Sequence, residues 1–334
     1  MQNLKERVTI YEVAVASGVS LATVSRVINH QGNVTEATRK KVEETIARLG
    51  YKPSGLAQAL ATSRSTTIGV VIPSANYVYI SNMLNGVTTV AKEKGFNLSL
   101  FVTSHNKDDA MKMIEKVITS HVDGVIIYDD ELSEEDVMKI NSYSVPTIVI
   151  DNKISGDKIG CITFGYEKLL EASLLNLFKK DNHEEPCFIH VHNQGRLLKQ
   201  LENSFVNVCN KANKQYRIFN VDDSYNRTYV DFVEYFKDHK SGYFICYRDS
   251  IAAAVMNAAN DSGLKVPEDV EVLSVIGTKY ANITRPTISG MNIDMQEVGK
   301  RAMYMLIDLQ NDQLVNKSYN FEAKYSKRGS TKEW

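Results

Sequence analysis

The sequence predicts an α/β protein in which a small three-helix domain precedes a larger core of two α/β lobes. With 334 residues, the chain is too long for one ordinary domain. Between residues 8 and 50, apolar side chains recur at helical spacing between residues that favour helix ends. From residue 67 onward, short apolar strands alternate with helical segments, and this alternation starts twice. These observations together predict the fold class.

The charge of the chain is unevenly distributed. Residues 1–65 contain nine Lys and Arg against five Asp and Glu, which gives a net charge of +4. Since the whole chain carries −1, residues 66–334 carry −5. A basic N-terminal segment followed by an acidic remainder is the asymmetry expected when one small domain binds phosphate groups.

The composition is that of a soluble globular protein, with 43% hydrophobic and 24% charged residues. The N-terminus is charged and polar, unlike a signal peptide, and no apolar run approaches the ~18 residues of a membrane span. We therefore expect a cytoplasmic protein without membrane contact. The cysteines form no CxxC pair, and we expect buried free thiols rather than disulfides or metal ligands at Cys161, Cys187, Cys209 and Cys246.

Motifs of the common catalytic and cofactor-binding sites are missing from the sequence. It contains no HExxH, GxSxG, Walker A or GxGxxG motif. His190 and His192 flank an expected strand end, and we interpret them as core or rim histidines rather than metal or ligand contacts. We expect a protein that is not an enzyme and that holds neither cofactor nor metal.

Two short helices separated by a tight turn are predicted near the N-terminus. Thr9 is a good N-cap for the first helix, and Gly18 ends it. Ser20 caps the second helix, which is expected over residues 21–29. The apolar face of this second helix is formed by Val24, Val27 and Ile28. The arrangement predicts a helix-turn-helix.

A third helix is expected to begin after Thr35 and to end at Gly50, and its apolar stripe completes a small core. This core would hold the second helix outward, where its side chains suit a DNA major groove. Leu21 and Ala22 stand at the end that reaches base edges. Short polar groups for phosphate oxygens are supplied by Thr23, Ser25 and Asn29. Arg26 is expected to bind guanine O6 and N7. Taken singly, each of these residues is better explained as solvated surface, but together, on a helix that follows this turn, they favour a DNA-binding face.

Four segments of the headpiece resemble the lactose/galactose repressor family, and the catabolite control branch is the most similar. The segments are residues 8–14, 19–29, 38–42 and 49–53. At the positions of Leu21 and Ala22, members of that branch carry a Met-Ala pair. The resemblance implies a DNA-binding transcription regulator, and it adds Thr9 and Tyr51 to the DNA-binding residues. It also implies a homodimer that acts as a repressor on a pseudo-palindromic operator.

The headpiece is expected over residues 1–53, and a hinge helix with its linker over residues 54–66. The apolar segment at 55–61 is too short to form a stable helix without a partner. The resemblance implies that two such helices pair in the dimer, with Ala57 at the DNA and Leu60 wedged into the minor groove. A plain flexible linker is the alternative.

The core over residues 67–334 is expected to have parallel sheets covered on both faces by helices. We expect strands at 68–72, 96–102, 122–128, 147–150, 186–191, 243–246 and 270–276, and helices near 83–91 and 108–119. The expected lobes are roughly 67–160 plus 293–320, and 161–292 plus 321–334. The resemblance implies a core of the periplasmic-binding-protein type, with a ligand cleft between the lobes.

The expected cleft departs from the family pattern. We assign Asn76, Tyr77, Arg248 and Asp249 as effector-binding candidates, and Arg248 is expected to pair with Asp249. Leu201 and Ile276 stand where we expect relatives to carry a ligand-binding arginine and aspartate. Sugar hydroxyls would be left unpaired there, at a cost of ~1–3 kcal/mol per group. A non-sugar ligand, a protein partner and no effector at all remain open.

A protein partner is implied by the catabolite control branch. Its co-effector, the phosphocarrier protein HPr phosphorylated on serine, docks on basic residues of a helix that matches residues 298–309. Lys300 and Arg301 are available there, whereas Tyr304 and Asp308 replace basic residues, and Asp308 would repel phosphate. The alternative to a DNA-binding regulator is a sugar-type binding protein without DNA regulation.

Overall fold

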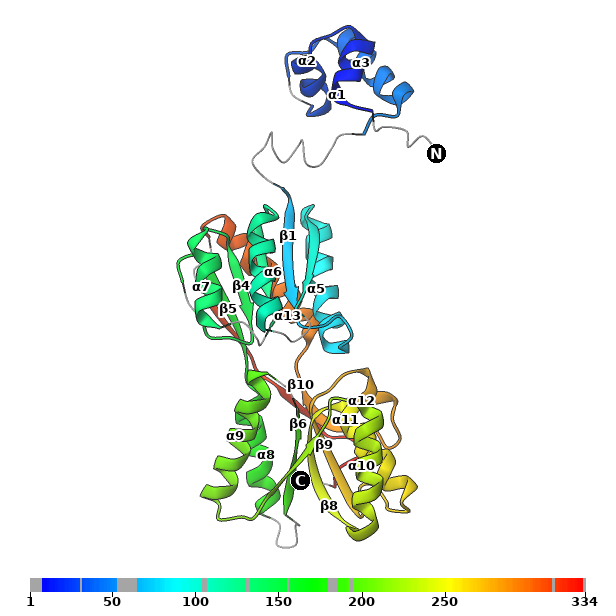
Figure 1. The fold of residues 1–334 in the computed structure, drawn as a ribbon, viewed down its shortest axis with the longest axis vertical. Coiled ribbons are helices and arrows are strands. Elements are labelled where there is room, and N and C mark those ends of the chain that lie inside the picture. Colours follow the sequence, from blue (N-terminus) through cyan, green and yellow to red (C-terminus); the bar gives the residue numbers. More distant parts are fainter. Residues whose placement is uncertain are drawn as a thin grey trace. The chain divides into compact units, whose positions relative to one another are not determined.

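The computed structural model describes residues 8–30, 32–52, 65–103, 107–129, 133–154, 156–179, 185–192, 195–313 and 316–332. The chain divides into two compact units, residues 1–66 and residues 67–334. The first unit contains the headpiece and the segment expected as hinge helix and linker, and the second unit is the core (Figure 1).

Over its described residues, the headpiece contains three helices, and its helix-turn-helix is confirmed. They are α1 (Ile10–Ser17), α2 (Leu21–Ile28) and α3 (Glu36–Leu49). Thr9 and Ser20, the predicted caps, and Thr35 before α3 each accept a backbone N–H. Gly18 and Gly50 end α1 and α3 in the left-handed conformation. The apolar sides of the helices meet in a small core built around Val13, Val24, Val27 and Val42.

The first lobe of the core is a parallel six-stranded sheet in the order β11-β5-β4-β3-β1-β2. The strands are β1 (Thr67–Ile72), β2 (Asn97–Val102), β3 (Gly124–Ile127), β4 (Thr147–Ile150), β5 (Ile159–Phe164) and β11 (Ser318–Phe321). Its helices are α5 (Val78–Lys94), α6 (Lys107–Thr119), α7 (Glu134–Ser142) and α13 (Met295–Gln310). Helices α5 and α13 pack together on one face, and α6 and α7 on the other (Figure 1).

The second lobe contains a six-stranded sheet in the order β12-β10-β9-β8-β6-β7, in which only β12 is antiparallel to its neighbour. The strands are β6 (Pro186–Val191), β7 (Arg217–Val221), β8 (Gly242–Arg248), β9 (Val270–Ile276), β10 (Ser289–Asn292) and β12 (Lys324–Ser326). Its helices are α8 (Tyr166–Phe178), α9 (Arg196–Lys211), α10 (Tyr225–Asp238), α11 (Asp249–Asp261) and α12 (Lys279–Ile283). Helices α8 and α9 pair on one side of the sheet, and α10 and α11 on the other (Figure 1).

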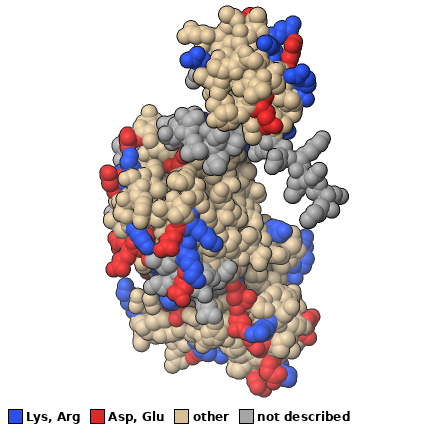
Figure 2. Space-filling model, turned by 45° about the horizontal axis from the view of Figure 1, so that its top comes forward, with Lys and Arg blue, Asp and Glu red and all other residues tan. Residues whose placement is uncertain are grey.

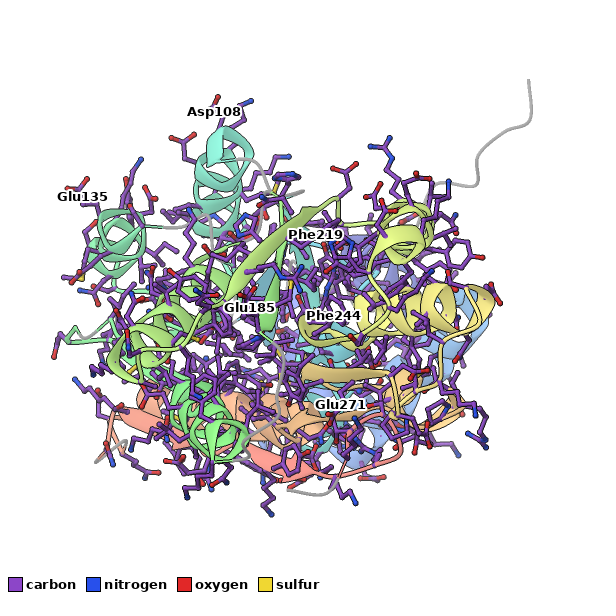
Figure 3. All side chains as sticks on the ribbon, turned by 90° about the horizontal axis from the view of Figure 1, so that it is seen from below. Asp108, Glu135, Glu185, Phe219, Phe244 and Glu271 are labelled. Carbon is purple, nitrogen blue, oxygen red and sulfur yellow. The ribbon has the colours of Figure 1, made fainter. Side chains whose placement is uncertain are left out.

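A few charged residues of the core, such as Arg248 and Asp249, are buried. On the face shown in Figure 2, surface side chains of both signs are mixed. Below them, a continuous group of buried side chains runs through both lobes, from Ile68 in β1 to Phe244 in β8. Figure 3 shows Phe219 and Phe244 among the elements of the second lobe, whereas Asp108 and Glu135 project from helices at the rim. A second buried group fills the other face of the first sheet, between β3 and the helices α6 and α7.

The expected boundary between the lobes needs correction. Residue 160 lies inside β5, and all of β5 pairs within the first sheet, so the chain leaves this lobe only after Phe164. Strand β11 likewise extends to Phe321 rather than to residue 320. The chain passes between the lobes after β5, between β10 and α13, and between β11 and β12.

The expected thiol state is confirmed, because all four cysteines are buried and free. In the described part of the chain, no group of three His, Cys, Asp or Glu side chains is arranged to hold a metal ion. Over the same residues, no single helix is long and apolar enough to cross a bilayer. The pair α1 and α2, bent by 108°, meets those criteria only when the two helices are taken together.

Candidate DNA-binding face and interlobe cleft

Helix α2 presents a polar face away from the headpiece core. Val24 and Val27 are buried, whereas Leu21, Ala22 and Arg26 are exposed. Ala22, Ser25, Arg26 and Asn29 follow one another at i, i+3, i+4 and i+7, so they share the side of the helix opposite the buried valines. This places the candidate base-contacting residues together on one accessible surface.

Hydrogen bonds between residues three or four positions apart orient the polar side chains of α2 and its two ends. The hydroxyl groups of Ser20 and Thr23 lie 2.9 Å apart, and Ser20 Oγ accepts the backbone N–H of Thr23. Asn29, the C-cap of α2, donates from Nδ2 to Ser25 Oγ over 3.3 Å. The helix therefore holds these groups in defined orientations before any DNA arrives.

Thr9 and Tyr51 have structural roles in the headpiece. Thr9 forms a capping box with Glu12, whose Oε2 accepts the Thr9 backbone N–H at 2.7 Å. These bonds hold the pKa of Glu12 below its ordinary value. Tyr51 is half-buried and packs against the headpiece core. Ala57 and Leu60 lie outside the described residues, and so does most of the segment expected at 54–66 as hinge helix and linker, because residues 53–64 are not described.

The cleft between the lobes of the core contains a cavity of about 370 Å³. It is formed by loops at the carboxyl ends of parallel strands, where α/β folds bind ligands. Asn76 and Tyr77 reach it from the loop after β1, and Arg248 and Asp249 from the junction of β8 with α11, so the four effector candidates lie together.

The expected pair between Arg248 and Asp249 is wrong. Arg248 instead forms an ion pair with Asp223, which follows β7, and its guanidinium lies 4.6 Å from the centre of the Tyr77 ring. The Tyr77 hydroxyl donates to Asp223 Oδ2 over 2.8 Å. Asp223, which sequence reasoning missed, is therefore the common partner of both effector candidates.

Asp249 is occupied by the backbone of its own lobe. Its Oδ2 accepts hydrogen bonds from the backbone N–H groups of Thr278 and Ala281 and from the Thr278 hydroxyl, at 2.5 to 3.0 Å. Burial raises its pKa, and these hydrogen bonds act in the opposite direction. Asp249 thus anchors the start of α12 and presents little of its surface to the cavity.

Leu201 and Ile276 are both buried, and neither lines the cavity. Ile276 is the last residue of β9 and is buried, so the cavity is lined from this segment by Thr278 and Tyr280 instead. Leu201 lies inside α9 and is fully buried. A second, smaller cavity of about 90 Å³ is lined by Arg196 at the start of α9. No motif in the sequence marked Arg196, because its partners come from a distant part of the chain.

Lys300 and Arg301 lie on α13, as expected, but both side chains are engaged. Lys300 Nζ lies 2.6 Å from Glu297 Oε1, and the Arg301 guanidinium lies 4.5 Å from the centre of the Tyr319 ring. Tyr304 donates to Glu93 on the neighbouring helix α5. The surface therefore combines basic, acidic and aromatic groups rather than a basic cluster.

Comparisons with known proteins agree with the two-unit organisation. Residues 9–54 match the model of bacterial regulatory proteins of the lacI family, and residues 175–331 match the periplasmic binding protein-like domain. Catabolite control protein A of Priestia megaterium is 30% identical over 322 residues, covering 93% of this chain and 95% of that protein. The HTH-type transcriptional regulator pepR1 of Lactobacillus delbrueckii subsp. lactis is 30% identical over 313 residues, covering 92% and 93%.

Among solved structures, the Lac repressor dimer bound to operator and the anti-inducer ONPF shares the fold, with a TM-score of 0.83. It is 23% identical and is matched over 98% of this chain and 99% of that chain. These relatives are transcription regulators rather than enzymes. The headpiece match favours a regulator over a sugar-binding protein without DNA regulation. From its full-length similarity and its helix-turn-helix, the chain belongs to the lacI family of DNA-binding transcription regulators.

Proposed function

We propose that the protein represses transcription by binding a pseudo-palindromic operator as a homodimer. The observation that carries this proposal is the exposed polar face of α2, with Arg26 at its centre and the buried valines behind it. In a symmetric dimer, two such helices would enter the major groove in two half-sites. The Lac repressor dimer bound to operator has the same fold, which supports this arrangement.

Base recognition is assigned to Leu21, Ala22 and Arg26, and phosphate contacts to a second set formed by Thr9, Thr23, Ser25, Asn29 and Tyr51. Arg26 is the member that can form two parallel hydrogen bonds to guanine. Ala57 and Leu60 are assigned to the operator centre, where an apolar wedge between base steps bends the duplex. The homodimer is expected to form through the core.

We propose that the site of regulation is the interlobe cleft rather than α13. A phosphate-bearing protein such as HPr would need unpaired cations, whereas Lys300 is paired with Glu297, and Asp308 lies on the same helix. The cleft instead contains a partly open cavity lined by polar groups from both lobes, a position where folds of this kind commonly bind ligands.

The test is a selection from random duplex DNA with the purified full chain, followed by fluorescence anisotropy at fixed near-physiological salt. We expect a two-fold symmetric site bound ~10³-fold or more tightly than a scrambled duplex of equal length. Sedimentation should give two chains per duplex. Equal affinity for all duplexes would contradict the proposed function.

A further inference from the structure

Three side chains join the two lobes at one end of the cleft. Tyr77 begins α5 in the first lobe, whereas Asp223 and Arg248 follow β7 and end β8 in the second. We call these three residues the cleft clasp. The Arg248 side chain is only 7% exposed and forms an ion pair with Asp223, which in turn accepts the Tyr77 hydroxyl. The Asp223 side chain is 27% exposed, so the ion pair is partly buried, and salt screens it less than a fully exposed pair.

The aromatic ring of Tyr77 strengthens the same junction. The Arg248 guanidinium lies 4.6 Å from the ring centre, within the range of a cation–π contact. On its other side, Tyr77 stacks on Tyr79, with ring centres 5.4 Å apart and planes 13° from parallel. The clasp is therefore attached to the buried part of the first lobe and does not depend on a mobile surface side chain.

A second bridge lies beside the smaller cavity, at the start of α9. Arg196 donates to Asn152 Oδ1 and to the backbone oxygen of Asp151, both of which follow β4 in the first lobe. Between the two bridges, ring contacts continue from Tyr79 to Tyr128 and on to Phe164. The lobes thus share polar bridges on either side of an aromatic row and one continuous buried core.

We propose that the cleft clasp holds the lobes together in place of a small-molecule effector. The core would then keep its operator-binding arrangement through its own side chains, with no added ligand. This inference rests on the proposed function and specifies its regulation. A ligand that binds only one arrangement of the two lobes shifts the equilibrium toward that arrangement. A contact within the protein that exists in only one arrangement, such as the cleft clasp, has the same effect.

Three variants of the full chain test the clasp. Arg248→Met removes the charge and keeps the stem, Asp223→Asn removes the opposite charge, and Tyr77→Phe removes only the hydroxyl. The matched control is Arg227→Met, because Arg227 pairs with Asp222, next to Asp223, yet its side chain is 74% exposed and the pair lies within one lobe. Affinity for the selected operator is measured by anisotropy in dialysed buffer, and circular dichroism checks folding.

We expect wild type and Arg227→Met to bind the operator without ligand within twofold of each other. Arg248→Met should bind at least tenfold more weakly, and Tyr77→Phe several-fold more weakly. If Arg248→Met does not fold, the isosteric Tyr77→Phe variant decides the outcome. Folded clasp variants that bind like the wild type overturn the clasp and leave the proposed function intact. A wild type that binds operator and scrambled DNA equally overturns both.

Discussion

Arg26 is the one long cationic side chain on the exposed face of α2, so it has both the reach and the donors to read a guanine. We predict that Arg26→Ala weakens operator binding by ~1–3 kcal/mol and relaxes the base preference at one position of each half-site. Anisotropy titrations with the selected operator, and with variants changed at each base in turn, measure both effects.

The matched control for Arg26 is Arg48→Ala, which removes the same charge from the exposed last turn of α3. If both arginines acted only through general electrostatic attraction, each substitution would lower the affinity for operator and for scrambled DNA by similar factors. Should Arg26→Ala keep the base preference of the wild type, Arg26 does not read a base.

The buried thiols make a second prediction at the scale of single residues. Burial raises the pKa of Cys187 to about 12 and that of Cys209 to about 11, from an ordinary value of 9.0. Between pH 9 and those values, the unfolded chain loses thiol protons that the folded chain keeps. The folded state is therefore expected to lose stability as pH rises through this window.

Two measurements check the thiols. An aromatic disulfide reagent at pH 8 should label no cysteine of the native protein and four after denaturation, because a buried thiol reacts slowly. Urea unfolding at pH 8, 9 and 10 should give a falling midpoint, with a smaller fall in Cys187→Ala. Rapid labelling of the native chain would show that the thiols are accessible.

At the scale of helices and strands, the headpiece could be predicted in detail because its signals are local. Thr9, Ser20 and Thr35 act through side chains that cap their own helices, and Gly50 ends α3 in a conformation that glycine adopts readily. The buried strands β1, β3, β4 and β9 were likewise visible as apolar runs. Strands β11 and β12 were not, because they are short and half exposed and exist only through pairing with distant strands.

The cleft could be predicted only in part, for a related reason. Sequence placed Arg248 beside Asp249, but a β-strand ends and a helix begins between them, so their side chains diverge. Arg248 meets Asp223 from another loop, and Asp249 meets the backbone around Thr278. Neighbours along the chain predict contacts within a helix, whereas partners in a cleft are set by how distant loops converge.

The pair of helices α5 and α13 makes a prediction about packing. Their backbones come so close that a Cβ on Gly86 would lie 2.0 Å from the carbonyl oxygen of Gln296, and one on Gly299 would lie 2.0 Å from that of Met83. No side-chain rotation relieves contact with a backbone oxygen. Gly86→Ala or Gly299→Ala should therefore lower the stability of the first lobe by about 1–3 kcal/mol.

The measurement is the shift of the urea midpoint, with Asn85→Ala on the exposed side of α5 as the control. This control should change stability by less than ~0.5 kcal/mol, because Asn85 faces solvent. If the glycine variants are as stable as the control, the two helices can separate without cost, and the close approach does not contribute to the fold.

At the scale of the whole molecule, charge separates the DNA-binding part from the rest. The net charge of +4 on residues 1–65 favours binding to phosphate, whereas the −5 of the remaining residues disfavours DNA contact by the core, whose visible surface mixes both signs (Figure 2). DNA binding should therefore depend on a small set of headpiece cations, each of which is present twice in the proposed dimer.

Such binding releases counterions from DNA and must weaken steeply as salt rises. We predict that raising salt from 50 to 200 mM lowers operator affinity by ~10³-fold or more, the behaviour of proteins that neutralise six or more phosphates. Anisotropy titrations at four salt concentrations give the slope of log affinity against log salt.

Two variants test which unit contacts the phosphates. Lys265→Gln is the control, because it removes a charge from the core and should leave the slope unchanged. Lys52→Gln removes a charge from the headpiece and should make the slope less steep by about one for each phosphate that is no longer neutralised. A slope that responds equally to both substitutions would place DNA on the core as well, and the division of labour between the two units would fail.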